Sequence, residues 1–365
     1  MNKIGFGFLR LPQMKAGADG IDWSLLNRMT DTFLASGGNY FDTAYTYLNG
    51  RSEEAVRRSV VERYPRNVFQ IADKLPSWKV TDDQDCYTYF EEQRKRCGVD
   101  FFDVYLLHWL NRANYEIAEK YHEFDFLRQM KKEGKAKRIG FSYHDNAALL
   151  DRILIAHPEV DIVQLQINYL DWDSAGIEAG KCYDIAVKHG KSIVVMEPVK
   201  GGTLANLPEE AERLFRDARK DRSIASWALR FAQSLGHVEV VLSGMNTLEQ
   251  MTDNMQDVLP LTDQEQEVIQ QAAEIMKRQT AIPCTGCRYC VEYCPKRIPI
   301  PDYFRMYNEV QRCPEDDWKI RPAYDELTAK HGKASECIRC KNCENHCPQQ
   351  LKISKNLEKV ASIFE

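Results

Sequence analysis

Short apolar runs alternate with longer amphipathic segments from residue 4 to about residue 261. Within each run the apolar character is nearly continuous, which is typical of parallel strands covered on both faces. The amphipathic segments begin after helix-capping residues, for example Asp22 and Asn146. Strand and helix alternate eight times, which predicts an α/β fold of the (β/α)₈ TIM barrel type. The predicted strands are Ile4–Leu9, Asn39–Thr43, Val68–Lys74, Phe102–Trp109, Ala136–Ser142, Ile162–Asn168, Ser192–Pro198 and Val238–Ser243.

An open doubly wound sheet is the competing α/β architecture. Its G-x-G-x-x-G fingerprint is absent, because the run from Gly5 to Arg10 lacks the third glycine. The barrel pattern stops near Leu261, where Thr262 and Glu265 form a capping box that predicts a helix over Asp263–Gln279. We therefore expect a barrel over 1–261, a connecting helix over 262–280 and a small, mainly α-helical domain over 281–365.

Three of the predicted strands deliver ionisable side chains to their carboxyl ends. Asp42, Lys74 and His108 lie at the ends of the second, third and fourth strands, and Tyr47 follows Asp42 by five residues. The carboxyl ends of parallel barrel strands meet at one mouth. The pattern therefore predicts that the four side chains meet there.

Together these groups can protonate a carbonyl oxygen. A phenol titrates near ~10 in water, so we expect the Lys74 ammonium to lower the pKa of Tyr47 and Asp42 to hold the lysine. His108 can donate to the same oxygen, and the hydride must come from a nicotinamide. Each residue alone has a structural alternative, as a helix cap, a packing tyrosine or a satisfied core histidine.

These stretches resemble the aldo-keto reductase family over about residues 1–260. The resemblance is carried by Phe41-Asp42-Thr43-Ala44, Asn49-Gly50-Arg51-Ser52-Glu53 and Leu106-Leu107-His108-Trp109, together with Tyr47 and Lys74. It implies that Tyr47 is the general acid, that Lys74 and Asp42 tune it and that His108 orients the carbonyl. NAD(P)H would lie across the barrel mouth.

The resemblance also implies cofactor contacts. Ser142 and its neighbour Tyr143 would meet the carboxamide and Gln164 would grip its other side, with Gln166 on the same face of the strand. Met196 stands where the family usually has an aromatic residue beneath the nicotinamide. The segment then continues through Pro198 to Lys200, which either pairs with the pyrophosphate or is a solvated loop lysine.

The segment after the eighth strand, Ser243–Asn254, is similar to the branch of the family that includes potassium-channel beta subunits. It contains no Lys or Arg, so a 2′-phosphate would rest on neutral donors and a helix N-terminus. NADP(H) is therefore favoured only weakly over NAD(H). The implied contacts with the adenosine and its phosphate are Gly244, Asn246, Gln250, Asp253 and Asn254.

Substrate contacts are predicted from Arg10 and Trp109. Arg10 follows the first strand and can bind a carboxylate or phosphate in bidentate fashion, or form a salt bridge on the rim. Trp109, Tyr45 and Tyr143 either line an apolar pocket or pack elsewhere.

Two cysteine runs dominate the tail. Each has the spacing C-x2-C-x2-C-x3-C-P of bacterial two-cluster ferredoxins, in which the fourth cysteine ligates the other cluster. This assigns one [4Fe–4S] cluster to each of two sets, with zinc as the alternative. The 42-residue gap between the runs favours a helical variant of the domain, and Cys313 within it is expected to be a buried thiol. Ile353–Phe364 has helical spacing. The two sets are Cys284, Cys287, Cys290 and Cys347, and Cys337, Cys340, Cys343 and Cys294.

Composition narrows the functional classes further. The 365 residues carry a net charge of −5, which indicates neither a nucleic-acid partner nor an anionic membrane surface. No apolar run approaches a bilayer span, and the N-terminus leads directly into a strand rather than into a secretory segment. Eight of the twelve cysteines lie at metal-ligand spacing, so a disulfide framework is disfavoured and a cytoplasmic location is expected.

The predicted function is reduction of an aldehyde or ketone by NAD(P)H, or the reverse, by an enzyme whose tail exchanges electrons with a redox partner protein. Hydride transfer moves two electrons and a cubane cluster moves one. The alternative is therefore an electron-transfer or redox-sensor protein whose barrel only binds the nicotinamide.

Overall fold

The structure is a computed structural model that describes residues 3–14, 20–256, 259–312 and 317–365, so Cys313 lies outside the described residues. The chain divides into two compact units. The first comprises Met1–Ser174, Glu178–Pro198 and Ser226–Leu261, and the second comprises Ala175–Ile177, Val199–Ala225 and Thr262–Glu365. In the described part of the chain, no helix combines the length and the apolarity needed to span a bilayer.

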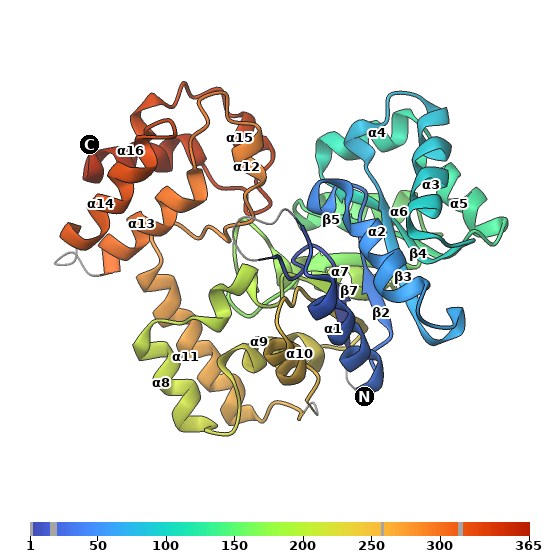
Figure 1. Cartoon of the computed structure of the whole chain (residues 1–365), viewed down its shortest axis with the longest axis horizontal. Coiled ribbons are helices and arrows are strands. Elements are labelled where there is room, and N and C mark those ends of the chain that lie inside the picture. Colours follow the sequence, from blue (N-terminus) through green and yellow to red (C-terminus); the bar gives the residue numbers. More distant parts are fainter. Residues whose placement is uncertain (1–2, 15–19, 257–258, 313–316) are drawn as a thin grey trace. The chain divides into compact units, whose positions relative to one another are not determined.

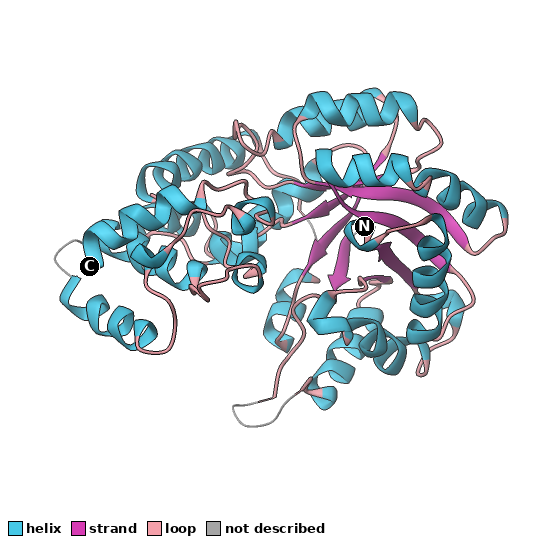
Figure 2. Ribbon diagram, turned by 90° about the horizontal axis from the view of Figure 1, so that it is seen from above, coloured by secondary structure: helices cyan, strands magenta, loops and turns pink. Residues whose placement is uncertain are grey.

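The first unit is built on a closed barrel of eight parallel strands in sequential order, with β1 paired to both β2 and β8. Several of the strands are labelled in Figure 1, and Figure 2 draws the strands as magenta arrows among the helices. The predicted (β/α)₈ fold is confirmed. Each observed strand starts and ends within two residues of its predicted start and end. They are β1 Ile4–Gly7, β2 Tyr40–Asp42, β3 Gln70–Leu75, β4 Phe102–Leu110, β5 Ala136–Tyr143, β6 Ile162–Gln166, β7 Ser192–Met196 and β8 Val238–Ser243.

Apolar side chains from β2, β3, β4, β6, β7 and β8 pack together in the barrel. A buried cluster joins Tyr40, Val104, Ile162, Val194 and Leu242, together with Ala72 and Leu106. A filled interior leaves only the ends of the strands free for polar chemistry.

Helices and short turns cover the barrel. The predicted caps are present: Asp22 accepts from the amide of Leu25, and Asn146 accepts from that of Leu149. The helices are α1 Trp23–Ala35, α2 Ser52–Val56, α3 Asp83–Cys97, α4 Arg112–Lys120, α5 Glu123–Lys132, α6 Ala147–Ala156, α7 Ala179–Lys188, α9 Ile224–Ser234 and α10 Leu248–Asn254, and the turns near the site are η1 Tyr47–Gly50 and η4 Ser77–Lys79.

Among the described residues of the second unit, the regular elements are helices and 3-10 turns, joined by loops. Both halves of the predicted capping box form at Thr262 and Glu265, and α11 has the predicted bounds Asp263–Gln279. The other elements are η5 Lys200–Ala205, α8 Glu209–Ala218, α12 Tyr289–Glu292, α13 Ile300–Arg312, α14 Asp317–Thr328, η7 Ala334–Glu336, α15 Asn342–Asn345 and α16 Ile353–Phe364.

The core of the cysteine-bearing segment lies between α13, α14 and α16. The rings of Tyr303 and Tyr324 are 4.6 Å apart, and those of Tyr324 and Phe364 stack at 4.7 Å. The helical spacing predicted for the end of the chain is confirmed, since the residues at that spacing are the buried ones. They are Ile353, Leu357, Val360 and Phe364.

Candidate active site and cysteine site

A buried lysine organises the barrel mouth. The Nζ atom of Lys74 lies 2.7 Å from both carboxylate oxygens of Asp42, 2.7 Å from the carbonyl oxygen of Thr43 and 3.4 Å from the hydroxyl of Tyr47. Lys74 is 0% exposed and Asp42 is 2% exposed. The structure therefore brings three of the four predicted catalytic residues into one contact group.

Local structure explains why Lys74 points to the mouth. It is the penultimate residue of β3, and its carbonyl accepts from Nε2 of Gln93 at 3.0 Å. The same nitrogen donates to Asp73 at 2.8 Å, and Tyr105 donates to Oε1 of Gln93 at 2.6 Å. These bonds hold the strand end on α3 and α3 on β4.

Tyr47 is aimed by an irregular turn. Leu48, Asn49 and Gly50 all have positive φ, at 50°, 56° and 81°, so the chain reverses within η1. Ser52, just after the turn, holds it in place. Its hydroxyl lies 2.7 Å from that of Thr43 and donates to the carbonyl oxygen of Phe8, in the first βα loop. The motif that carried the family resemblance thus builds this turn.

His108 completes the group from β4. Its ring centroid lies 5.7 Å from that of Tyr47 and 5.2 Å from that of Trp78. Burial, with the charge of Lys74 adding to it, lowers the pKa of His108 well below its usual value. The imidazole is therefore neutral at physiological pH and carries one ring N–H to donate.

The predicted direction of the Tyr47 shift was wrong. Burial, followed by the carboxylate of Asp42, raises the pKa of Tyr47 well above its usual value. The reason is that Lys74 makes its short bonds to Asp42 and to the carbonyl of Thr43, so its charge is already balanced when it reaches the phenol at 3.4 Å. Tyr47 is therefore a protonated donor at neutral pH.

Two residues of the predicted cofactor set carry polar atoms suited to a carboxamide. Oε1 of Gln164 is buried and has no hydrogen-bond partner among the described residues, while its Nε2 lies 3.6 Å from the sulfur of Met196. The hydroxyl of Ser142 accepts from the amide of Trp109 at 2.7 Å, which leaves its own proton to donate. An amide ligand donates to the first oxygen and accepts from the second, so these residues fit a nicotinamide.

Other predicted neighbours are engaged elsewhere. The hydroxyl of Tyr143 donates to the carbonyl of Asn146 at 2.6 Å, because adjacent strand residues point to opposite faces. Tyr45 donates to Glu92 at 3.2 Å. Gln166 donates to Asp171 at 3.0 Å.

The segment after β8 is organised by its own polar side chains. The amide of Asn246 donates to Oε1 of Gln250 at 2.8 Å, and Nδ2 of Asn254 donates to the hydroxyl of Ser243 at 2.9 Å. Gly244 packs against the side chain of Arg10, where a Cβ would lie 3.4 Å from the nearest atoms. Asp253 lies in the last turn of α10.

Arg10 forms the rim ion pair that was its alternative role. Its Nη2 atom lies 3.8 Å from Oε1 of Glu197. Glu197 is the residue after β7 and has a φ of 55°. Pro198 is the last residue of the Glu178–Pro198 segment of the first unit. Lys200 belongs to the second unit, where its Nζ donates to Gln349 at 2.8 Å and its side chain is 2% exposed. Lys200 is therefore not the solvated lysine of the second alternative.

Sequence reasoning missed two aromatic neighbours of the site. Burial lowers the pKa of His144 to about 4, and its ring lies 6.3 Å from that of Trp109. The ring of Trp78 lies 5.6 Å from that of Trp109. The position of His144, one residue beyond β5, was the available indication, because strand ends carry barrel chemistry.

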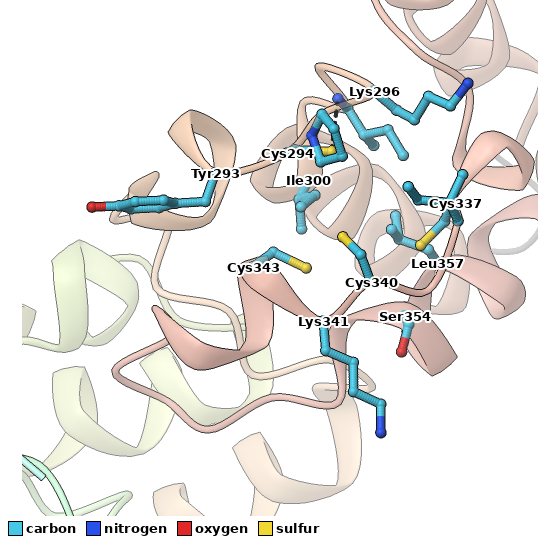
Figure 3. Close-up of a pocket in the computed structure, with 13 residues that line it drawn as sticks. Tyr293, Cys294, Lys296, Ile300, Cys337, Cys340, Lys341, Cys343, Ser354 and Leu357 are labelled. Carbon is cyan, nitrogen blue, oxygen red and sulfur yellow. Dashed lines mark hydrogen bonds between the residues drawn. The ribbon is translucent and has the colours of Figure 1, made fainter. Parts of the chain in front are cut away.

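Four of the tail cysteines, those of one predicted set, come together in the structure. Cys294, Cys337, Cys340 and Cys343 line one pocket, and their side chains project into a common space (Figure 3). In the other set, burial raises the pKa of Cys284 to about 11, and the thiolates of Cys287 and Cys347 add to that rise. Burial also raises the pKa of Cys290, and the thiolates of Cys287, Cys284 and Cys347, with that of Cys343 from the other set, add to the rise.

The spacing of the thiols bears on the metal they fit. Within the described ranges, no three His, Cys, Asp or Glu side chains converge as a single ion requires. A zinc ion needs its ligand atoms within about 2.3 Å of one point, whereas a cubane cluster holds its cysteines around a larger body. The donor set, thiols only, fits an iron–sulfur cluster.

The fold and the site together define a barrel oxidoreductase with an iron–sulfur tail. The model of the aldo/keto reductase family matches residues 3–274, so the chain belongs to that family. The model of a 4Fe-4S dicluster domain matches residues 283–352. An aldo-keto reductase of Mycolicibacterium vanbaalenii is 26% identical over 226 residues, which cover 61% of this chain and 74% of that protein.

Solved structures agree on the fold. The holo form of aldo-keto reductase AKR11C1 from Bacillus halodurans has a TM-score of 0.61 at 23% identity, over 74% of this chain and 91% of that one. The aldo/keto reductase from Klebsiella pneumoniae, in complex with NADP and acetate, has a TM-score of 0.60 at 19% identity, over 75% of this chain and 91% of that one.

Another relative by sequence is a 9,11-endoperoxide prostaglandin H2 reductase of Trypanosoma cruzi. It is 26% identical over 39% of this chain and 44% of that protein.

Proposed function

We propose that this protein is a cytoplasmic NAD(P)H-dependent oxidoreductase that reduces an aldehyde or ketone to an alcohol, or runs the reverse reaction. The observation that carries the proposal is the buried contact group of Asp42, Lys74 and Tyr47, with the neutral ring of His108 beside the phenol. A protonated phenol and a neutral imidazole are two donors suited to one carbonyl oxygen.

The roles follow from the charges. The carbonyl oxygen accepts from the hydroxyl of Tyr47 and from the ring N–H of His108, which fixes the carbon for attack. A bound nicotinamide supplies the hydride. The proton of Tyr47 then moves to the alkoxide oxygen, and the phenolate that remains is stabilised by the ammonium of Lys74, 3.4 Å away. Asp42 keeps that ammonium charged and in place.

Ser142 and Gln164 would hold the carboxamide of the cofactor through the hydroxyl proton and the buried oxygen described above. The NADP complex of the Klebsiella pneumoniae reductase supports NADP(H) as the cofactor. Ser243–Asn254 contains no cationic residue, so discrimination by the 2′-phosphate is expected to be modest. Comparison of KM for NADPH and NADH measures it.

The tail would hold two [4Fe–4S] clusters, one on Cys284, Cys287, Cys290 and Cys347 and the other on the second set. The proposal rests on the two cysteine groupings and on the family match over residues 283–352. Such clusters exchange single electrons, here with a redox partner protein. A visible spectrum with iron and sulfide analysis of anaerobically purified protein separates clusters from zinc.

Tyr47→Phe tests the catalytic assignment, and Tyr45→Phe is a matched control, because its hydroxyl contacts Glu92 instead of Lys74. With anaerobic protein and a panel of carbonyl compounds, Tyr47→Phe should lose at least about 100-fold in kcat, the usual scale of general acid catalysis. Tyr45→Phe should keep the wild-type rate. Equal rates for wild type and Tyr47→Phe would remove Tyr47 from the mechanism.

A second candidate function is favoured by the dicluster domain itself. In it the barrel binds a nicotinamide and the clusters carry the activity, as an electron carrier or redox sensor. EPR of the anaerobic protein distinguishes the two. Cluster reduction on adding NADPH without a carbonyl compound supports the second candidate, and turnover of a carbonyl with clusters unchanged supports the first.

A further inference from the structure

The observed contact of Lys200 is different from the pyrophosphate contact that the sequence predicted for it. Lys200 is the first residue of η5. Its Nζ donates to Oε1 of Gln349 at 2.8 Å, and the two side chains are 2% and 8% exposed. Gln349 follows Cys347 by two residues. A lysine predicted to hold a pyrophosphate is therefore bound to the segment that carries a cluster cysteine.

The next residue fixes η5 to a second cysteine segment. Gly201 has a φ of +66°, and a Cβ added to it would lie 2.4 Å from the carbonyl oxygen of Thr285. Only glycine allows this approach. Thr285 follows Cys284 and is 6% exposed. Two consecutive residues of η5 thus contact the chain beside two of the four cysteines of one set.

The conformation of Lys200 indicates that this placement is imposed. Its φ is 48°, in the left-handed region, which is unfavourable for a residue with a side chain. Surrounding structure must hold such a residue, and strain of this kind gathers at functional sites.

We propose that Lys200 is a positioning residue of the first cluster, the one assigned to Cys284, Cys287, Cys290 and Cys347, and that its buried charge favours the reduced state of that cluster. The proposal rests on the cluster assignment made under the proposed function. One-electron reduction adds one negative charge to the cluster and leaves its iron and sulfide in place. Net charge and nearby hydrogen bonds set cluster potentials, and a buried ammonium is little screened by solvent.

The test is an EPR-monitored redox titration of the full anaerobic protein, with dithionite as the reductant. Lys200→Met should shift the midpoint potential of one cluster to a more negative value and leave the other unchanged. Lys200→Arg, which keeps the charge, should keep most of the wild-type potential. The matched control is Lys296→Met: Lys296 is an exposed lysine that lines the pocket of the other cysteine set, so its removal should leave the first cluster unchanged.

The same proteins are titrated with NADPH by fluorescence. Potentials equal to wild type in Lys200→Met would overturn the proposal. If NADPH affinity also fell tenfold or more, Lys200 would be a pyrophosphate ligand instead. Unchanged affinity with one shifted potential supports the cluster role.

Two further outcomes are distinguishable. Wild-type protein without iron and sulfide would defeat the cluster assignment itself, independently of Lys200. If Lys200→Met alone fails to hold its clusters while Lys200→Arg holds them, the charge is required at the first cluster and the proposal stands. If neither variant holds them, Gln349→Leu decides: it removes the acceptor of Lys200, and a shift of one potential supports the proposal whereas none overturns it.

Discussion

Replacing Lys74 by Met is expected to destabilise the barrel strongly. The variant removes an ammonium with 0% exposure and leaves the Asp42 carboxylate, 3% exposed, without its cation. Breaking a buried ion pair from one side costs about 3–5 kcal/mol, which corresponds to a fall in melting temperature of roughly 10 °C for a unit of this size. Urea unfolding of the anaerobic protein, followed by circular dichroism, measures the change.

The pKa of Asp42 adds a pH dependence to this prediction. Burial already raises the pKa of Asp42, and Lys74 opposes that rise, so the variant should raise the pKa further. A carboxyl with a raised folded-state pKa stabilises the fold below its unfolded pKa and loses that contribution as pH rises, so the deficit should shrink from pH 7 to pH 5. Adding Asp42→Asn to Lys74→Met should recover part of the loss. If Lys74→Met alone were as stable as wild type at pH 7, the buried ion pair would not contribute to stability as argued.

Three other perturbations have defined outcomes. Because the pKa of Tyr47 is raised and that of His108 is lowered, kcat for carbonyl reduction should stay nearly constant from pH 6.5 to about 9, as a pH–rate profile would show. Burial raises the pKa of Glu123 to about 7. The free energy of unfolding is therefore greatest below the unfolded-state pKa of this carboxyl and falls by about 3 kcal/mol as pH rises through 7. Glu123→Gln should flatten this pH dependence in urea titrations at pH 5 and 8. Phe364→Ala, which removes the ring stacked on Tyr324, should cost about 3–5 kcal/mol, seen as earlier bleaching of the cluster absorbance on heating.

The parts of the fold that sequence reasoning predicted are those that local patterns determine. Continuous apolar runs located the eight strands because strands covered on both faces need them. Caps located the starts of α1, α6 and α11. The third strand was placed two residues early at its start, because Val68, which ends a 3-10 turn, and Phe69 are apolar although they precede the strand.

The errors at the site have long-range causes. The contact between Lys200 and Gln349 joins residues 149 positions apart, so no pattern near Lys200 reveals it. The direction of the pKa shift of Tyr47 depends on how far the ammonium of Lys74 is already neutralised by its hydrogen bonds to Asp42 and to the carbonyl of Thr43. That balance of burial and charge exists only in the folded chain. His144 was missed because one histidine beyond a strand end has no distinguishing spacing.

The corrected pKa of Tyr47 changes what the tail can be for. A phenol that stays protonated at neutral pH completes a two-electron reduction with the hydride donor and its own proton, so the proposed barrel reaction needs no single-electron step. The clusters, if they exchange electrons, then act on a different partner or report on redox state. The charge proposed to act on the first cluster would serve either role, since a higher potential keeps a cluster reduced under milder conditions. Reduction of the clusters by NADPH without a carbonyl compound, more than the identity of that compound, is therefore the observation that separates an electron carrier from a carbonyl reductase.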